Sequence, residues 1–327
     1  MYPLEFLPEA ILLAAVLLIF LLDVLGVRRL EAFGGVAVGA LGLSFLTVLA
    51  DLGLAVLAPL RTVAPDLVDL PSTAALYQWT SLGFVFQAIF LVAAFLVALA
   101  SLSRPSDAPG SAVFFGLLLL ATLGMLLVAV ASDLIFLLLA IEVTSIATYL
   151  LVGYTRKDPS GLEAAMKFYI IGALSTALSF YGASLLFSAY GSTGFLALSE
   201  APGTVGYPTL ALVGYGLLIA GLAFKVTAVP FHAWAVDVYD GAPSEVSAFL
   251  AGGSKKMGIF AFFLVLLGPV LFFDGARSLR PAPGAFDFAA SLQLTIGVLA
   301  VLTMTVGNVL ALFQREMKRM LAYSSIS

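Results

Sequence analysis

Three ionisable side chains lie deep inside apolar stretches of the chain: Glu142, Lys225 and Lys255. A charge at the centre of a bilayer costs about 2.5–3.5 kcal/mol even on lenient insertion scales. Such residues generally face the interior of a helix bundle or a wet cavity, where they mark an ion or proton path. A carboxyl group and two amines can each bind and release one proton. The three residues therefore predict a proton-conducting membrane protein.

Glu142 follows the apolar run Leu134–Ile141. As a helix this run is about 12 Å long, so the carboxyl group cannot easily reach the near membrane surface. The alternative interpretation is a structural carboxyl group, either protonated or hydrogen-bonded to a neighbouring helix. We favour a functional role, because an ionisable residue inside a membrane is functional by default.

Lys225 comes shortly before Pro230. A proline lacks the backbone N–H and clashes with the carbonyl group four residues earlier, here that of Val226. This predicts a helix discontinuity within about residues 223–230, with Glu142 near Lys225. A broken helix exposes backbone groups that can hold water or ions at membrane depth. The alternative is a lysine that extends from the end of a span to the interface.

Lys255 and Lys256 are adjacent and follow the segment Ala251–Ser254, which contains two glycines. Neighbouring residues point about 100° apart on a helix, so both are not expected to line one path. One of them can instead face a partner or anchor the span at the interface. Physical reasoning from the sequence does not choose between them.

Three further residues are weaker candidates. Glu163 and Lys167 are spaced i and i+4, the favourable orientation for an ion pair on a helix. They form either a surface pair or part of a proton entrance. His232 follows Pro230 and is either a hydrogen-bonded structural group or a proton relay. Hydroxyl groups in the same region can hold water or simply pair helices; they are Tyr149, Tyr169, Ser175 and Ser179.

The elements that must position these residues are membrane spans. Of 327 residues, 62% are apolar and 10% are charged, and the mean hydropathy is +1.12. Backbone groups in lipid must be satisfied internally, which predicts helices. We expect nine complete spans and a tenth that begins near Met320. The nine cover about residues 8–27, 33–57, 78–102, 111–131, 134–153, 163–190, 208–229, 244–273 and 288–313. Proline-rich linkers punctuate them at residues 104–110, 158–161 and 281–284. The first run has no basic leader, so we expect a retained span.

The basic residues predict the orientation. With the N-terminus outside, eight basic residues fall in inside loops and three in outside loops, in agreement with the positive-inside rule. The inside set is Arg28, Arg29, Arg104, Arg156, Lys157, Arg315, Lys318 and Arg319, and the outside set is Arg61, Arg277 and Arg280.

Several functions are disfavoured. The net charge of −4 argues against nucleic acid as a partner. The absence of cysteine excludes disulfides, iron–sulfur ligation and thiolate zinc sites, and one histidine is too few for haem or copper clusters. No G-x-G-x-x-G motif follows a strand. We therefore expect no cofactor and no metal in this chain.

Four blocks of the sequence resemble a known family. Residues 221–234 (GLAFKVTAVPFHAW) look like the signature of the antiporter-like subunits of respiratory complex I. Residues 237–243 (DVYDGAP) narrow the resemblance to the subunit N branch of bacterial NADH–quinone oxidoreductase. Residues 163–169 (EAAMKFY) and 317–327 (MKRMLAYSSIS) are similar to further blocks of that family. The resemblance runs from about residue 111 to the end of the chain.

The resemblance implies an all-α polytopic bundle with inverted repeats and a discontinuous seventh helix. It divides the chain into three N-terminal helices (1–110), a first five-helix repeat (111–287) and the beginning of a second repeat (288–327). Glu142 matches the glutamate that the family pairs with its seventh-span lysine, here Lys225. Lys255 matches the central eighth-span lysine. The chain stops within the tenth-span motif, without the twelfth-span lysine, so we expect a partial chain.

The implied function is proton translocation in the membrane arm of a respiratory NADH–quinone oxidoreductase, in the bacterial inner membrane. NADH, FMN, iron–sulfur clusters and quinone belong to partner subunits, and the expected neighbours are other antiporter-like and small hydrophobic subunits. One alternative is a subunit of a multi-subunit sodium/proton antiporter, which shares the Lys225–Trp234 block; residues 237–243 argue against it. Another is a structural spacer that does not conduct, which the three buried charges argue against.

Overall fold

The computed structural model describes residues 6–27, 29–61, 78, 80–103, 110–154, 159–198, 207–271 and 288–327. Within them the chain is helical, apart from one isolated bridge between Asp133 and Gly194. The helices are α1 (Leu7–Val24), α2 (Leu30–Arg61), α3 (Ser81–Ser101), α4 (Ser111–Ala129), α5 (Leu134–Val152), α6 (Pro159–Tyr190), α7 (Phe195–Leu198), α8 (Pro208–Lys225), α9 (Ala233–Gly241), α10 (Ser244–Phe249), the π-helical turn η2 (Leu250–Ser254), α11 (Lys255–Leu271), α12 (Phe288–Leu312) and α13 (Met317–Ile326).

The predicted polytopic all-α bundle is confirmed. In the described part of the chain, eight helices are long and apolar enough to cross a membrane, and α8 is a shorter apolar helix. Each of the nine predicted spans coincides with a helix or a run of helices, and α13 begins close to the expected tenth span. The linker at 281–284 and all of 104–110 except Gly110 lie outside the described residues, as does residue 158, whereas residues 159–161 of the third predicted linker form the start of α6. The repeat boundaries therefore stay predictions.

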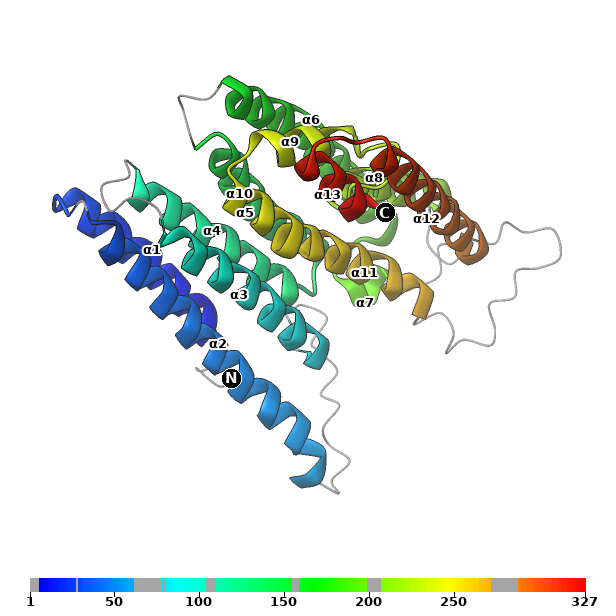
Figure 1. The fold of residues 1–327 in the computed structure, drawn as a ribbon. Helices are drawn as coiled ribbons and strands as arrows, with labels where there is room; N and C mark the ends of the chain where they lie inside the picture. The colour runs from blue at the N-terminus through cyan, green and yellow to red at the C-terminus, as the bar shows by residue number, and fades with distance from the viewer. Residues whose placement is uncertain are drawn as a thin grey trace.

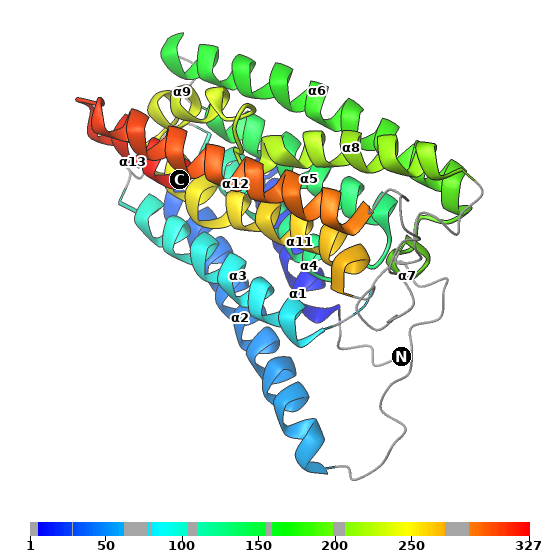
Figure 2. The ribbon, with the colours of Figure 1, turned by 90° about the vertical axis from the view of Figure 1, so that its right-hand side faces the viewer.

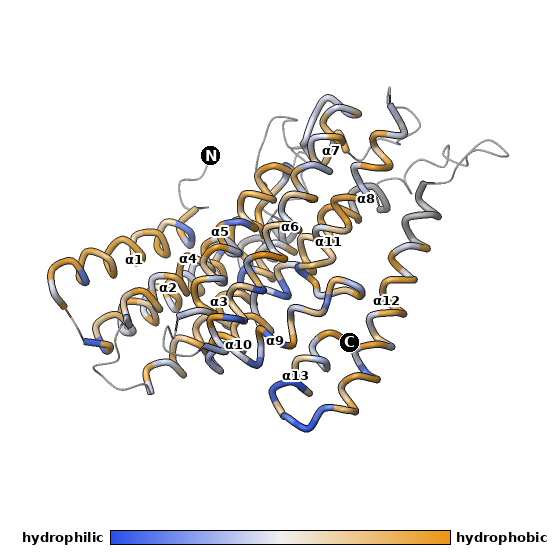
Figure 3. The backbone as a smooth tube through the Cα atoms, turned by 90° about the horizontal axis from the view of Figure 1, so that it is seen from above, coloured by the Kyte–Doolittle hydropathy of each residue, from blue (hydrophilic) through white to orange (hydrophobic). Residues whose placement is uncertain are grey.

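Helix α4 is the most enclosed span. It lies against α1, α2, α3 and α5. Of an 18-residue apolar stretch of α4, 83% of the residues are buried, compared with 11% for α12. Figures 1 and 2 show the hairpins α1–α2 and α3–α4 on one side of the bundle and α6, α8 and α9 on the other, with α12 on the outside. Figure 3 shows apolar residues along most of each span, and hydrophilic residues at the turn into α13. The bundle thus encloses α4, which packs against α5, the helix that carries Glu142.

Small residues let α6 and α8 pack backbone to backbone. Gly172, Ser175, Ser179 and Gly182 form one stripe along α6, and all four are buried. Gly214 and Gly221 face this stripe from α8: a Cβ atom at Gly182 would lie 2.7 Å from the carbonyl oxygen of Gly214. Close approach through small residues is how membrane helices associate without a hydrophobic driving force. This contact fixes the position of α8, and hence of Lys225 at its end.

Two spans are interrupted near ionisable residues. The seventh ends at Lys225, four residues before the predicted end of the span, and the chain becomes helical again only at Ala233. The predicted discontinuity within 223–230 is therefore confirmed. The eighth contains the π-helical turn η2 directly before Lys255. This turn and the short helices α7 and α9 were not predicted.

The α6–α8 contact gives the first prediction. In Gly182→Ala, the added methyl group meets backbone atoms of α8 that cannot rotate away, so the helices must separate. We expect a loss of about 1–3 kcal/mol of stability, as for other overpacked sites. Gly216→Ala is the matched control, because nothing lies within 4 Å of a Cβ atom there. Thermal unfolding of the purified protein in detergent measures both variants. Equal melting temperatures would show that the contact does not fix α8.

Candidate functional site

Lys225 is the last residue of α8, at the point where the helix ends inside the bundle. The freed carbonyl groups are satisfied locally: the Thr227 N–H donates to Phe224 O (3.1 Å) and the Ala228 N–H donates to Ala223 O (2.9 Å). The C-terminal end of a helix carries a partial negative charge that favours a cation. The break therefore gives the ammonium group of Lys225 a favourable position.

The break itself is held in an unusual conformation. Thr227 has a φ of 59°, and it is fully buried. Left-handed backbone at a β-branched residue costs about 1–3 kcal/mol and persists only when the surroundings enforce it. The Val229–Pro230 peptide bond is cis. The Val229 N–H, which has no helical partner, donates to Thr303 Oγ1 of α12 (2.9 Å).

Glu142 and Lys225 line the same small cavity. Its volume is about 10 Å³, the lower limit for one water molecule. Lys225 is 7% exposed, and its Nζ has no hydrogen-bond partner among the described residues. Glu142 is half-buried between α5 and α6, and its Oε1 accepts a short hydrogen bond from the Thr176 hydroxyl. The lining residues are Leu138, Ile141, Glu142, Ser175, Thr176, Ser179, Phe180, Gly221, Leu222 and Lys225.

Aromatic rings enclose the other side of Lys225. Its Nζ lies 5.7 Å from the ring centroid of Tyr149 and 5.9 Å from that of Phe224, within range of a cation–π attraction. Phe168 stacks on Trp234 with centroids 4.5 Å apart and meets Tyr149 edge-on at 4.6 Å. This cluster joins α5, α6, α8 and α9. It links the surroundings of Lys225 to α9.

Lys255 lies on α11, directly after η2. It is 6% exposed, and its Nζ donates to the carbonyl oxygen of Ser325 and to Ser325 Oγ (3.3 Å), both on α13. Gly258, one turn further along α11, packs on the end of α8: a Cβ atom there would lie 3.0 Å from Lys225 O. Lys256 is exposed. The structure thus separates the two adjacent lysines and turns Lys255 inward.

The predicted Glu163–Lys167 pair forms, but as part of a larger cluster. Lys167 Nζ lies 2.9 Å from a carboxylate oxygen of Glu163 and 2.9 Å from one of Asp237 on α9. Arg319 of α13 reaches Asp237 (3.4 Å) and Asp240 (3.3 Å). The hydrogen bond from Lys167 holds the pKa of Asp237, which lies outside the apolar spans, below its usual range. These residues are not among those that line the Glu142–Lys225 cavity.

His232 lies between the break and α9. Its backbone carbonyl accepts the Ala235 N–H (3.0 Å), and its Nδ1 is buried without a hydrogen-bond partner among the described residues. It does not line the cavity. Both interpretations of its side chain, the structural group and the proton relay, stay predictions.

Sequence reasoning missed three groups that complete the site: Thr176, Thr303 and Ser325. Ser325 and Arg319 belong to residues 317–327, which resemble a block of the family. The resemblance pointed to this segment but not to the individual residues. Thr176 and Thr303 carried no signal, because a hydroxyl group in an apolar helix is ordinary. Their roles come only from the helices that they face.

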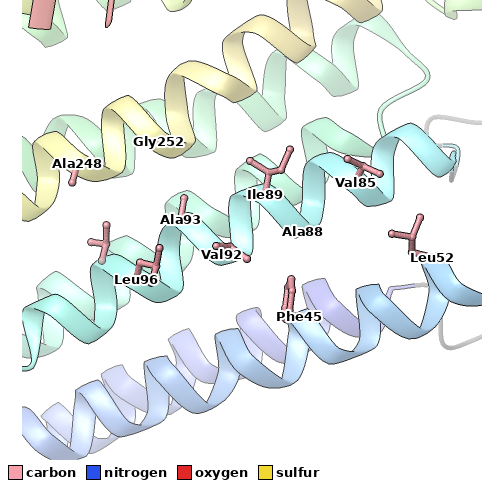
Figure 4. Close-up of a pocket in the computed structure, with 11 residues that line it drawn as sticks. Phe45, Leu52, Val85, Ala88, Ile89, Val92, Ala93, Leu96, Ala248 and Gly252 are labelled. Carbon is pink, nitrogen blue, oxygen red and sulfur yellow. The ribbon is translucent and has the colours of Figure 1, made fainter. Parts of the chain in front are cut away.

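A second cavity, larger than the one that Glu142 and Lys225 line, has an apolar lining. A groove of about 620 Å³ lies between α3 and the neighbouring segments α2, α10 and η2 (Figure 4). Apolar residues and one glycine line it, among them Phe45, Ile89, Val92 and Gly252. Over the described ranges, no group of three or more His, Cys, Asp or Glu residues is placed to hold a metal ion.

Comparison with known proteins identifies the family. A family model described as "NADH:quinone oxidoreductase/Mrp antiporter, TM" matches residues 131–327. Subunit N of the F420H2 dehydrogenase of Methanosarcina mazei is 38% identical over 322 residues, which cover 98% of this chain and 61% of that protein. Subunit 2 of the NAD(P)H-quinone oxidoreductase of Synechocystis is 36% identical over 325 residues, 98% of this chain and 57% of that protein.

A solved structure has the same fold. A chain of respiratory complex I from Thermus thermophilus with bound aureothin superposes with a TM-score of 0.74 at 30% identity, covering 98% of this chain and 61% of that one. The chain thus spans about three fifths of the length of the relatives that it matches. Together with the broken seventh span and its buried lysine, these matches show that the chain belongs to the membrane-spanning family of the NADH:quinone oxidoreductases and Mrp antiporters.

Proposed function

We propose that this chain is part of a proton-translocating subunit in the membrane arm of a quinone-reducing respiratory dehydrogenase. The observation that carries the proposal is the small cavity that Glu142 and Lys225 share at the end of a broken helix. Relatives named as NADH-quinone oxidoreductase and F420H2 dehydrogenase subunits support it.

Glu142 controls the charge of Lys225 in the proposed mechanism. A carboxylate a few ångströms away favours the ammonium form of a lysine, and moving it away favours release of the proton. The cavity between them has room for at most about one water molecule, so a small shift of α5 against α8 changes their interaction strongly. The released proton passes towards Lys255, whose helix packs on the end of α8 through Gly258.

Electron transfer takes place elsewhere in the proposed complex. NADH or a related donor, FMN, iron–sulfur clusters and quinone belong to partner subunits, which shift α5 or its neighbours.

Glu142 is half-buried in the isolated chain. A carboxyl group that faces lipid is costly, so we infer that an adjacent membrane-arm subunit covers this side of α5. The complex lies in the bacterial cytoplasmic membrane, with the N-terminus outside.

A sodium/proton antiporter subunit is the second candidate, since the family name covers both kinds of complex. The buried Lys225 does not separate the two candidates, because the antiporter subunits share the Lys225–Trp234 block. Residues 237–243 (DVYDGAP) argue against the antiporter, because their form resembles subunit N. Proton pumping by the assembled complex in sodium-free buffer tests this distinction.

Lys255 and Lys256 provide a matched pair of variants. We expect Lys255→Ala to remove most proton pumping and coupled quinone reduction, because a buried relay group is lost. Lys256→Ala, an exposed site one residue away, should lose little. Lys255→Arg should also fail, since a guanidinium group does not release its proton. Rates and proton yields in membrane vesicles, with assembly checked on native gels, give the answer. Equal, mild losses in both alanine variants would remove Lys255 from the path.

Glu142 is tested with an isosteric change. Glu142→Gln keeps the hydrogen bond with Thr176 but removes the charge that holds the Lys225 proton. We expect a loss of most pumping with normal assembly. Glu31→Gln is the control, because Glu31 is an exposed acid on α2, away from the proposed proton path. Full pumping by Glu142→Gln would favour the structural-spacer alternative.

The orientation is tested by chemical labelling. The chain has no cysteine, so each introduced cysteine is unique. Ser160 is exposed at the start of α6, and Gln78 is exposed just before α3. The starts of these two helices lie at opposite ends of the bundle. We expect Ser160→Cys to react only from the cytoplasmic side and Gln78→Cys only from the outside. The reverse pattern would overturn the orientation inferred from the basic residues.

A further inference from the structure

A second buried acidic group lies among the N-terminal helices, far along the chain from Glu142, Lys225 and Lys255. Glu9, in the first turn of α1, is 5% exposed, and Gln87, on α3, is 1% exposed. Gln87 Nε2 donates to Glu9 Oε1 (2.8 Å) and, more weakly, to the carbonyl oxygen of Leu126 on α4 (3.4 Å). One amide thus ties α1, α3 and α4 together around a carboxyl group.

The site has more hydrogen-bond acceptors than donors. Gln87 has two amide hydrogens, and both have an acceptor. Glu9 Oε2 and Gln87 Oε1 are buried and have no donor in the described structure. Buried polar atoms are almost always paired, and an unpaired one is costly. A proton on Oε2 turns one of the two acceptors into a donor.

The charges around Glu9 favour the neutral acid. Asp51 of α2 is close enough to interact electrostatically with Glu9, and it is also acidic. The sequences of α3 and α4 contain no ionisable residue. Asp23, Arg29 and Glu31 lie at the opposite ends of α1 and α2. The N-terminal end of α1 and the Gln87 amide favour an anion, but no described cation offsets the burial of a full charge.

We propose that Glu9 is a second proton-binding site of this protein, occupied at neutral pH, and that Gln87 is its positioning residue. The Glu9 carboxyl group takes its proton from water, on Oε2, and returns it to water. Glu9 lies two residues after the first residue of α1, about 3 Å along the helix axis, so the route to the membrane surface is short. This site does not depend on the Glu142–Lys225–Lys255 path. The two assignments can therefore fail separately.

Infrared spectroscopy of the purified full-length protein in its complex tests the proposal. A protonated carboxyl group gives a C=O stretching band that a carboxylate lacks, and the band shifts in heavy water. We expect Glu9→Gln to remove one such band at neutral pH. Glu31→Gln is the control, because Glu31 is an exposed acidic residue on α2, the helix next to α1. An unchanged set of carboxylic-acid bands in Glu9→Gln would overturn the proposal, since Glu9 would then be ionised.

Gln87→Met gives a second, independent readout. It leaves the carboxyl group in place and removes the amide hydrogen bond, so the Glu9 band should persist and move to higher frequency. A spectrum without any change would show that Gln87 does not position a protonated acid. This variant also decides the question if Glu9→Gln does not assemble. Repeating the spectra with and without sodium identifies the other occupant: a carboxylic-acid band that appears only without sodium would show a cation site, and would overturn the proposal.

Discussion

The structure depends on one constraint: a charged side chain and unpaired backbone groups must coexist inside a low-dielectric bundle. Ending α8 at Lys225 releases polar groups where no bulk water can satisfy them. The break is possible because neighbouring carbonyl groups and the Thr303 hydroxyl take up the free N–H groups. The helix end in turn stabilises the ammonium group of Lys225. Charge and break thus require each other.

The packing of the bundle also holds Lys225 and the residues around it in place. Small residues bring α6 and α8 into backbone contact, which places the hydroxyl groups of α6 at the wall of the cavity. The ring of Tyr149 and the stacked pair Phe168–Trp234 pack together next to Lys225. Gly258 removes the side chain that would otherwise separate α11 from Lys225. A substitution in these contacts therefore alters the geometry of the acid–base groups as well as stability.

The sequence predicted those features that rest on strong local rules. Pro230 cannot continue a helix, so the break after Lys225 was predictable, and intramembrane charges must find partners, so the approach of Glu142 was too. The choice between Lys255 and Lys256 required the family resemblance, because it depends on helix rotation. The turn η2 was not predicted, since its two glycines are ordinary in a membrane-spanning helix. Asp237 looked like a loop residue, although it joins Lys167 and Arg319 from two other helices.

The hydrogen bond from Val229 to Thr303 has a consequence for biosynthesis. The two residues are 74 positions apart, so the donor is made well before its acceptor. At about 5–20 residues per second, the ribosome needs several seconds to reach α12. During that time α8 can be inserted, but the amide of Val229 lacks its final partner and must be satisfied by water or by another chain. The five helices α4 to α8 are therefore not a self-sufficient insertion unit, and the half-helix matures only when a later span arrives beside it.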